Sequence, residues 1–288
     1  MLLIRAADGA REPAADRRTG HAAAGRLVRV HADRSRRPRV GVLGPIVIED
    51  RTGALIEPPG ALAKALVATL AVAPRDVGGT VGVDTIVDEL WGDAPPRNAK
   101  AALQTLVSRL RGIAADGLVV SHPGGYSLGV SAEELDLGAA SAVGADPASP
   151  GDEPTAVVAR LDEALELWRG EPALDLADAP IAETLAERAS SLRLRLLERR
   201  ADARAAADDH AGSAEDLAVL VAAAPADERL VAARLRALAA SGHRVEAIAE
   251  YGAFRERLAD ELGVSPSAEL VELNAELLRD DGDAPRHR

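Results

Sequence analysis

The chain has 288 residues, enough for two ordinary domains, and 47% of them are hydrophobic, which is enough for a substantial core. It contains no cysteine, so disulfide scaffolds, thiolate zinc sites and cysteine catalysis are excluded. Aromatic residues make up only 2%, which argues against a stacking platform for single-stranded nucleic acid. No apolar stretch approaches the roughly 18 residues of a membrane-spanning helix, and the apolar start before Arg5 is too short for a secretory signal, so we expect a cytoplasmic protein.

Acidic and basic residues are distributed unevenly along the chain, whose net charge is −12. Residues 1–38 carry nine arginines against four acids, residues 39–130 carry eight bases against nine acids, and residues 131–288 carry seventeen bases against thirty-three acids. A large acidic excess repels nucleic acid and favours protein partners. The nearly neutral middle block can bind nucleic acid only if its bases gather on one face.

Composition divides the chain into four segments. Residues 1–38 show no helical or strand period and are expected to form a disordered Arg-rich tail. The other predicted segments are a strand-containing domain over 39–131, an all-α domain over 132–280 and a second disordered tail over 281–288. The fold is therefore predicted to be mainly α with a small β component.

Residues 39–92 alternate short apolar runs with turn signals. Strands are expected over 40–43, 46–48 and 54–56, and helices over 61–72 and 83–91. Pro74 is expected to end the first helix, while Asp84 is the candidate N-cap and Gly92 the end of the second. The glycine-rich stretch over 77–82 lacks the lysine of a phosphate-binding loop and is interpreted as a flexible loop.

The segment over 96–114 is expected to be a helix with prolines in its first positions. At about 100° per residue, its apolar residues fall on one side, namely Ala99, Ala102, Leu103, Leu106, Leu110 and Ile113. The opposite side carries Arg97, Lys100, Gln104, Ser108 and Arg111, with Ala101 and Thr105 at its edge. No acid lies between residues 94 and 115. The pattern favours a helix that meets an anionic partner; the alternative is an ordinary surface helix with a solvated face.

Two short strands over 118–121 and 126–128 flank a Pro-Gly-Gly turn and predict a hairpin directly after this helix. Strands, two helices, a polar-faced helix and a hairpin follow the order of a winged helix-turn-helix, whose third helix enters the DNA major groove. The residues expected to lie nearest the bases are Arg97, Lys100, Gln104 and Thr105. Those expected to contact phosphate are Ser108, Arg109, Arg111 and His122.

The second domain is predicted to consist of stacked helix pairs. Helices are expected over 156–169, 181–210, 213–223, 227–241, 244–262 and 267–279. Pairs of this length are typical of a tetratricopeptide-like array. The acidic excess indicates a surface for protein partners, and the alternative is a plain helical domain that its acids keep in solution. Trp91 and Trp168 have apolar neighbours and are assigned to the cores of the two domains.

Motifs in both domains connect the chain to a known family. Residues 40–45 (VGVLGP), 87–96 (VDELWGDAPP), 103–111 (LQTLVSRLR), 125–128 (GYSL), 135–137 (LDL) and 164–172 (ALELWRGEP), with a last helical pair over 247–270, resemble the Streptomyces antibiotic regulatory protein family. The resemblance implies an OmpR-type winged helix, a bacterial transcriptional activation domain, direct-repeat target DNA upstream of secondary-metabolite genes, and RNA polymerase as partner. Ser127 stands where relatives often have arginine, so modest DNA affinity, or help from the Arg-rich tail or a homodimer, is expected.

The sequence lacks the motifs of catalysis. It has no phosphate-binding loop with lysine and no Gly-x-Ser-x-Gly elbow, and its six histidines are scattered without metal-ligand spacing. We therefore expect a non-enzyme without metal or cofactor. The favoured function is a sequence-specific activator that binds double-stranded DNA. The alternative is a protein-interaction adaptor, in which the helical array binds the partner and the winged domain serves docking or dimerisation.

Overall fold

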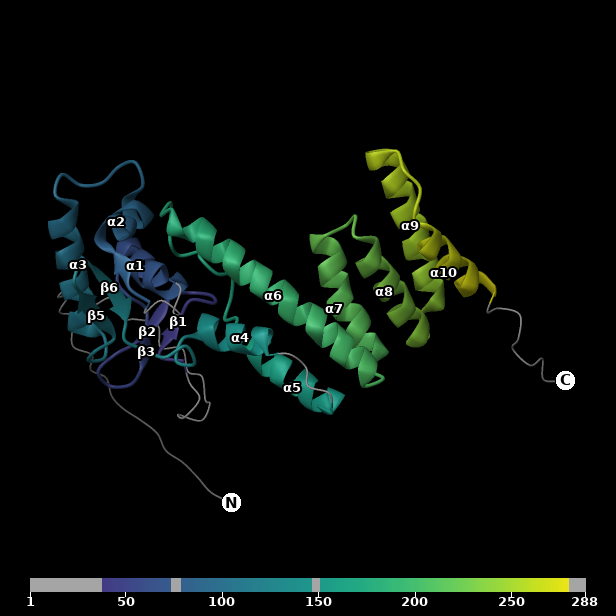
Figure 1. Cartoon of the computed structure of the whole chain (residues 1–288), viewed down its shortest axis with the longest axis horizontal. Helices are drawn as coiled ribbons and strands as arrows, with labels where there is room; N and C mark the ends of the chain where they lie inside the picture. Colours follow the sequence, from purple (N-terminus) through teal and green to yellow (C-terminus); the bar gives the residue numbers. More distant parts are fainter. Residues whose placement is uncertain (1–37, 74–78, 147–150, 280–288) are drawn as a thin grey trace, which may run out of the picture.

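The structure, a computed structural model, describes residues 38–73, 79–146 and 151–279 (Figure 1). Three predicted features lie outside the described residues: the N-terminal tail over 1–37, the C-terminal tail over 281–288 and the helix end at Pro74. The described chain is mainly helical, with two small antiparallel sheets in its N-terminal part, which confirms the expected fold class. None of the described helices combines the length and the apolar composition that a membrane span requires.

The first sheet consists of three short strands. β1 (Val40–Gly41), β2 (Val47–Glu49) and β3 (Leu55–Ile56) pair antiparallel in chain order, and Ile48 lies opposite both Val40 and Ile56. Val40, Ile46 and Ile48 are fully buried. Branched side chains of this kind pack well on a pleated surface that is covered on one face, so the apolar runs form the expected strands.

Three helices follow in this part of the chain: α1 (Ala61–Val72), α2 (Val83–Trp91) and α3 (Ala99–Ile113). α1 is buried along most of its length and forms the centre of the N-terminal part. α2 has the expected bounds, but its N-cap is Gly82 and no side chain caps it, so the assignment of Asp84 as N-cap is wrong. Asp84 lies in the first turn instead, where a carboxylate still faces the positive end of the helix dipole.

The second sheet contains the expected hairpin and one further strand. β5 (Val119–His122) and β6 (Gly125–Leu128) form the hairpin, and β4 (Val81–Gly82) pairs with the other edge of β6. The interpretation of 77–82 as a flexible loop is therefore wrong for its last two residues. β4 is too short to show a period of its own, and it is ordered because Val81 pairs with Tyr126, far away in sequence.

The remaining elements of the described chain are all helices: α4 (Asp136–Ala145), α5 (Pro154–Leu165), α6 (Ile181–Ala206), α7 (His210–Ala223), α8 (Glu228–Ala240), α9 (Arg244–Leu262) and α10 (Ala268–Arg279). The sequence did not predict α4, because its small residues and glycines give no apolar stripe. α5 and α6 end before the expected residues 169 and 210. The other helices lie close to their expected ranges.

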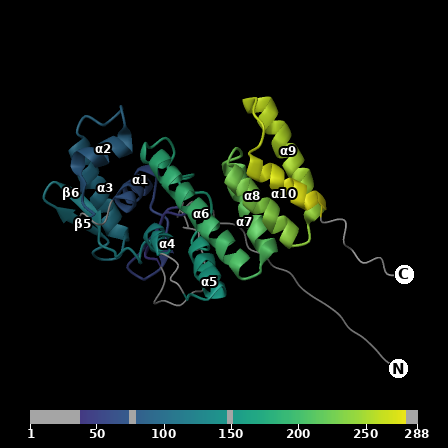
Figure 2. The same ribbon diagram turned by 45° about the vertical axis from the view of Figure 1, so that its right-hand side comes forward.

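α6 crosses the middle of the molecule (Figure 1, Figure 2). We call the two sheets with α1, α2 and α3 the winged part. The N-terminal half of α6 lies beside α1 in the winged part, and its C-terminal half packs against α7, from which α8, α9 and α10 continue the row. Consecutive helices pack against each other along this row, in agreement with the predicted array of helix pairs.

Two apolar clusters form the interior of the described chain. The first joins the strands and α1 to α3 with α4, α5 and most of the buried face of α6, so it crosses the predicted boundary between residues 131 and 132. The second extends from Leu197 to Leu277. Trp91 and Trp168 are half-buried and both pack against the first cluster, so their assignment to two separate cores is wrong. The winged part and the first helices of the array share one core.

Candidate DNA interface

α3 packs on one face and is exposed on the other. Leu103, Val107 and Leu110 are its buried residues, at the i, i+4 and i+7 positions that lie on one side of a helix. The expected apolar residues Ala99, Ala102, Leu106 and Ile113 are only half-buried, and Val107 was not among those expected. The core face is therefore turned slightly from its predicted direction.

The start of α3 differs from the prediction. Asn98 is the N-cap, and its side-chain oxygen accepts a hydrogen bond from the Ala101 N–H at 3.0 Å. Both prolines and Arg97 precede the helix, so the expected start at residue 96 is wrong. An asparagine that can satisfy a free N–H makes a better helix start than the proline before it. Arg97 is exposed and lies in the turn that leads into the helix.

Lys100, Gln104, Ser108 and Arg111 fall within about 80° of arc on the exposed side, at about 100° per residue. Thr105 is exposed beyond them, and its hydroxyl donates to the Ala101 carbonyl at 3.0 Å. Arg109 lies a further step round the helix, about 100° from Ser108. The structure therefore brings together four of the residues expected on α3, while Arg109 faces a different direction.

Arg111 connects α3 to the hairpin. Its Nε donates to the Val119 carbonyl at 3.0 Å, and its Nη2 donates to the Ser121 hydroxyl at 2.8 Å. These bonds occupy two of its three guanidinium nitrogens. Arg111 therefore braces the hairpin against the helix, and only Nη1 is left without a partner among the described residues. Its expected contact with phosphate stays a prediction.

His122 lies at the end of β5, opposite Gly125. Its Nε2 is 2.8 Å from the Ser127 hydroxyl, and the residue is half-buried. The hairpin therefore holds the imidazole by one nitrogen. The other nitrogen is the one that could face a phosphate, and this expectation also stays a prediction.

Arg51 is a base near α3 that the sequence did not single out. It lies in the turn between β2 and β3, its side chain is 61% exposed, and its Nη2 donates to the Arg111 carbonyl at 3.3 Å. An exposed arginine in a turn carries no signal of its own in the sequence. Only the folded chain brings it to the end of α3, where its Nε lies 3.7 Å from Asp116 Oδ1.

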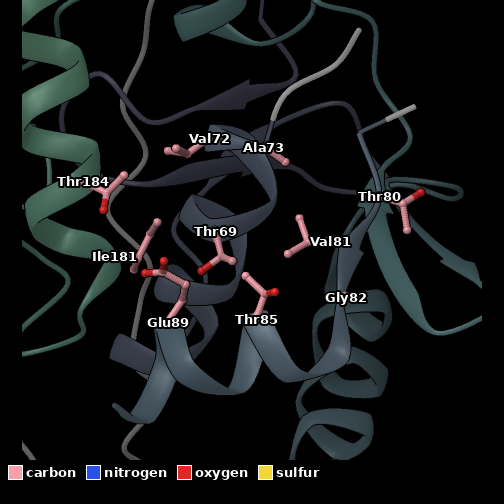
Figure 3. A pocket seen from close by; sticks show the side chains of 10 residues that line it. All are labelled: Thr69, Val72, Ala73, Thr80, Val81, Gly82, Thr85, Glu89, Ile181 and Thr184. Carbon is pink, nitrogen blue, oxygen red and sulfur yellow. The ribbon is translucent and has the colours of Figure 1, made fainter. Parts of the chain in front are cut away.

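The structure also contains a cavity of about 290 Å³ away from the exposed face of α3 (Figure 3). Residues of α1, of the β4–α2 segment and of the start of α6 line it, including Val72, Val81 and Ile181 and the side chains of Thr69, Thr85 and Glu89. The Thr69 hydroxyl donates to the Ala65 carbonyl at 2.9 Å, within its own helix.

In the described part of the chain, no three His, Asp or Glu side chains gather as metal ligands would.

Comparisons with known proteins give the chain its relatives. The bacterial transcriptional activator domain family matches residues 135–278. The regulatory protein AfsR of Streptomyces coelicolor is 38% identical over 246 residues, which are 84% of this chain but 24% of AfsR. The regulatory protein DnrI of Streptomyces peucetius is 30% identical over 262 residues, which are 86% of this chain and 95% of DnrI. The chain thus spans about a quarter of AfsR and nearly all of DnrI.

A solved structure agrees with these matches. Mycobacterium tuberculosis EmbR, in complex with a low-affinity phosphopeptide, superposes with a TM-score of 0.68 at 26% identity, over 85% of this chain and 65% of EmbR. The transcriptional regulator RedD of Streptomyces coelicolor is 33% identical over 84% of this chain and 71% of its own length. The matched family domain, the two-part fold and these named regulators agree, and the chain belongs to the Streptomyces antibiotic regulatory protein family of transcriptional activators.

Proposed function

We propose that this regulator binds double-stranded DNA sequence-specifically through α3 and activates transcription through contact of its helical domain with RNA polymerase. In this arrangement α3 enters the major groove and the β5–β6 hairpin lies over the sugar-phosphate backbone. The exposed face of α3 carries the proposal: bases and an amide lie along it, no acid lies between residues 94 and 115, and a hairpin braced by Arg111 follows.

The side chains on this face suit base recognition. Arginine and lysine pair with the O6 and N7 of guanine, and glutamine pairs with the N6 and N7 of adenine. Lys100 and Gln104 are exposed on the N-terminal half of α3, the half that contacts base edges in helix-turn-helix proteins, and Arg97 is exposed in the turn just before it. Ser108, Arg109 and Arg111, with His122 on the hairpin, provide the contacts to phosphate.

The helical domain provides the protein contact. Residues 131–288 carry thirty-three acids against seventeen bases, which repels DNA and leaves protein as the partner. The named relatives are regulators of transcription, and RNA polymerase is the partner that an activator needs. The proposed target is a pair of direct repeats, each bound by one chain in the cytoplasm, with no catalytic step and no cofactor.

The deciding experiment measures fluorescence anisotropy of a labelled duplex from the intergenic DNA upstream of the gene, with a random duplex of equal length as control. Specific binding should exceed random binding by at least about 10³. Binding through phosphate should also weaken steeply between 50 and 200 mM salt, because counterions are released, by about a factor of ten for each two phosphates neutralised. Equal affinity for both duplexes would reject base recognition.

A protein-interaction adaptor is the second candidate, and one observation favours it. Large apolar side chains are exposed at the far end of the array on and around α9 and α10, namely Val245, Leu262, Val264, Val271 and Leu278. Exposed apolar groups support protein binding. The adaptor predicts no binding to either duplex at low salt, and so the anisotropy experiment separates the two functions.

A further inference from the structure

Three motifs that carry the family resemblance meet at one place, and that place is not the exposed face of α3. Residues 40–45, 135–137 and 164–172 are far apart in sequence, yet hydrogen bonds join all three. They lie where the winged part meets the helical domain. We call their contacting residues the joint: Gly41, Val42, Leu43, Pro45, Asp136 and Arg169.

Asp136 is the centre of the joint. It is the first residue of α4 and is 1% exposed. Its Oδ2 accepts the Val42 N–H at 2.8 Å and the Leu43 N–H at 2.9 Å, and its Oδ1 accepts the Leu137 N–H at 2.7 Å. Burial raises the pKa of Asp136 above its usual range, although these N–H groups and the Arg169 guanidinium act in the opposite direction. The buried carboxylate thus fastens α4 to the strand segment.

Arg169 closes the joint from the other side. Its Nη2 lies 3.2 Å from Asp136 Oδ2, its Nη1 donates to the Pro45 carbonyl at 2.8 Å, and its backbone N–H donates to the Leu43 carbonyl at 2.8 Å. The guanidinium needs a glycine beside it, because a Cβ on Gly41 would collide with Nη2. A residue after α5 therefore makes two hydrogen bonds with the segment that begins the winged part and one ion pair with Asp136 of α4.

Three further contacts lie along the same boundary. Asp175 Oδ2 accepts the Ile46 N–H at 3.0 Å and pairs with Lys64 Nζ at 2.8 Å. On α6, Arg188 Nη1 donates to the Val72 carbonyl at 2.7 Å. Directional bonds at several points add to the shared apolar core in opposing rotation and sliding of the winged part, because each bond is lost when its donor and acceptor are misaligned.

We propose that the joint fixes the orientation of the winged part relative to the helical domain. When α3 lies in the DNA groove, the helices that contact the polymerase are then held in one orientation relative to the DNA. Arg169 is then a positioning residue: activation requires it, while binding of α3 to DNA does not. This inference rests on the proposed function only in its expectation for transcription, and its expectation for the orientation of the two parts is independent of it. A ligand or partner can be held productively only by the fraction of molecules that has the right orientation.

The first test measures the orientation directly and without DNA. The chain has no cysteine, so Asp116→Cys in the winged part and Asp208→Cys after α6, whose native side chains are 95% and 98% exposed, accept a single pair of spin labels. Pulsed electron spin resonance then gives the distance distribution between them. Arg169→Ala should broaden it. The matched control is Arg160→Ala, which removes an arginine of α5 whose partners among the described residues, Asp146 and Asp152, lie outside the joint.

A second variant removes the contact without removing the charge. Gly41→Ala should displace the Arg169 guanidinium and broaden the distance distribution in the same way. In the Arg169→Ala background there is no guanidinium left to displace and only the close approach of the new Cβ to Val47 Cγ2 remains, so Gly41→Ala should add less broadening than it causes in the wild-type chain. Non-additivity of this kind is expected for residues in direct contact. Full additivity would contradict the assigned contact.

The third readout separates positioning from stability. In a transcription assay with purified polymerase, Arg169→Ala should lower transcript yield about tenfold, while its affinity for the upstream duplex changes less than about threefold. Circular dichroism at the assay temperature must show both variants folded. A narrow distribution in Arg169→Ala, or equal broadening in Arg160→Ala, would overturn the proposal. If the wild-type chain binds no DNA, the proposed function fails, but the distance measurement still decides whether the joint fixes the orientation.

Discussion

At the scale of single residues, Arg97 and Gln104 are the side chains for which base contact and phosphate contact differ measurably. Arg97→Ala and Gln104→Ala should each lose about 1–3 kcal/mol of binding free energy on the cognate duplex and little on random DNA, because only the cognate base edge is lost. Arg109→Ala is the matched variant: it should weaken both duplexes alike and reduce the salt slope by about 1. Anisotropy titrations at several salt concentrations measure both effects. Equal losses on the two duplexes would assign Arg97 and Gln104 to phosphate.

Replacing Arg111 is expected to affect the hairpin itself, because Arg111 donates two hydrogen bonds to it. Arg111→Ala should increase amide hydrogen exchange in β5 and β6, since the two bonds that hold the hairpin against α3 disappear. Lys100→Ala, which removes another base from the same face, should leave that exchange unchanged. Hydrogen exchange followed by mass spectrometry provides the comparison, and identical patterns for the two variants would show that Arg111 does not brace the hairpin.

At the scale of elements, periodicity predicted those with a repeating apolar face. α1 and α2 have the expected bounds, and the β5–β6 hairpin follows its Pro-Gly-Gly signal. β4 and α4 were missed, because a two-residue strand exists only through its partner and α4 has small residues on every side. The joint was not predictable either, since its hydrogen bonds join residues 94 and 124 positions apart. Sequence patterns report local periods and not such distant contacts.

The start of α3 gives a prediction at this scale. Asn98→Ala should lower the free energy of unfolding by about 1 kcal/mol, because the Ala101 N–H loses its capping acceptor. Asp84→Ala should change it by less than about 0.5 kcal/mol, since Asp84 makes no cap. Urea unfolding followed by circular dichroism gives both values. A loss for Asp84→Ala as large as that for Asn98→Ala would show that its carboxylate stabilises the start of α2 as much as a cap does.

At the scale of the whole molecule, the winged part and the start of the helical array behave as one body. The first apolar cluster crosses the predicted boundary between residues 131 and 132, and the carboxylate that satisfies the Val42 and Leu43 N–H groups belongs to Asp136, beyond that boundary. Buried N–H groups without acceptors are costly. The domain boundary between residues 131 and 132 stays a prediction. Because the core crosses it, truncating the chain at this boundary tests it directly.

A fragment of residues 39–131 should therefore fail to fold stably, whereas a fragment of residues 39–206, which keeps α4, α5 and α6, should fold and bind the upstream duplex. The shorter fragment loses Asp136 and exposes the first cluster, whereas the longer one keeps Asp136 and keeps the cluster buried.

The longer fragment also lacks residues 207–279, which hold fourteen acids and seven bases, a net charge of −7. Its affinity for DNA at low salt should equal or exceed that of residues 39–279, which lack the Arg-rich tail as well, because a repulsive field has been removed. The gain should vanish near physiological salt, where the screening length is about 8 Å. Transcription should not be activated, since α7 to α10 are absent. Thermal melting, anisotropy and a transcription assay on both fragments test these expectations. A cooperative melt of the 39–131 fragment would show that the winged part folds without the joint, and activation by the 39–206 fragment would show that the far helices are not the polymerase contact.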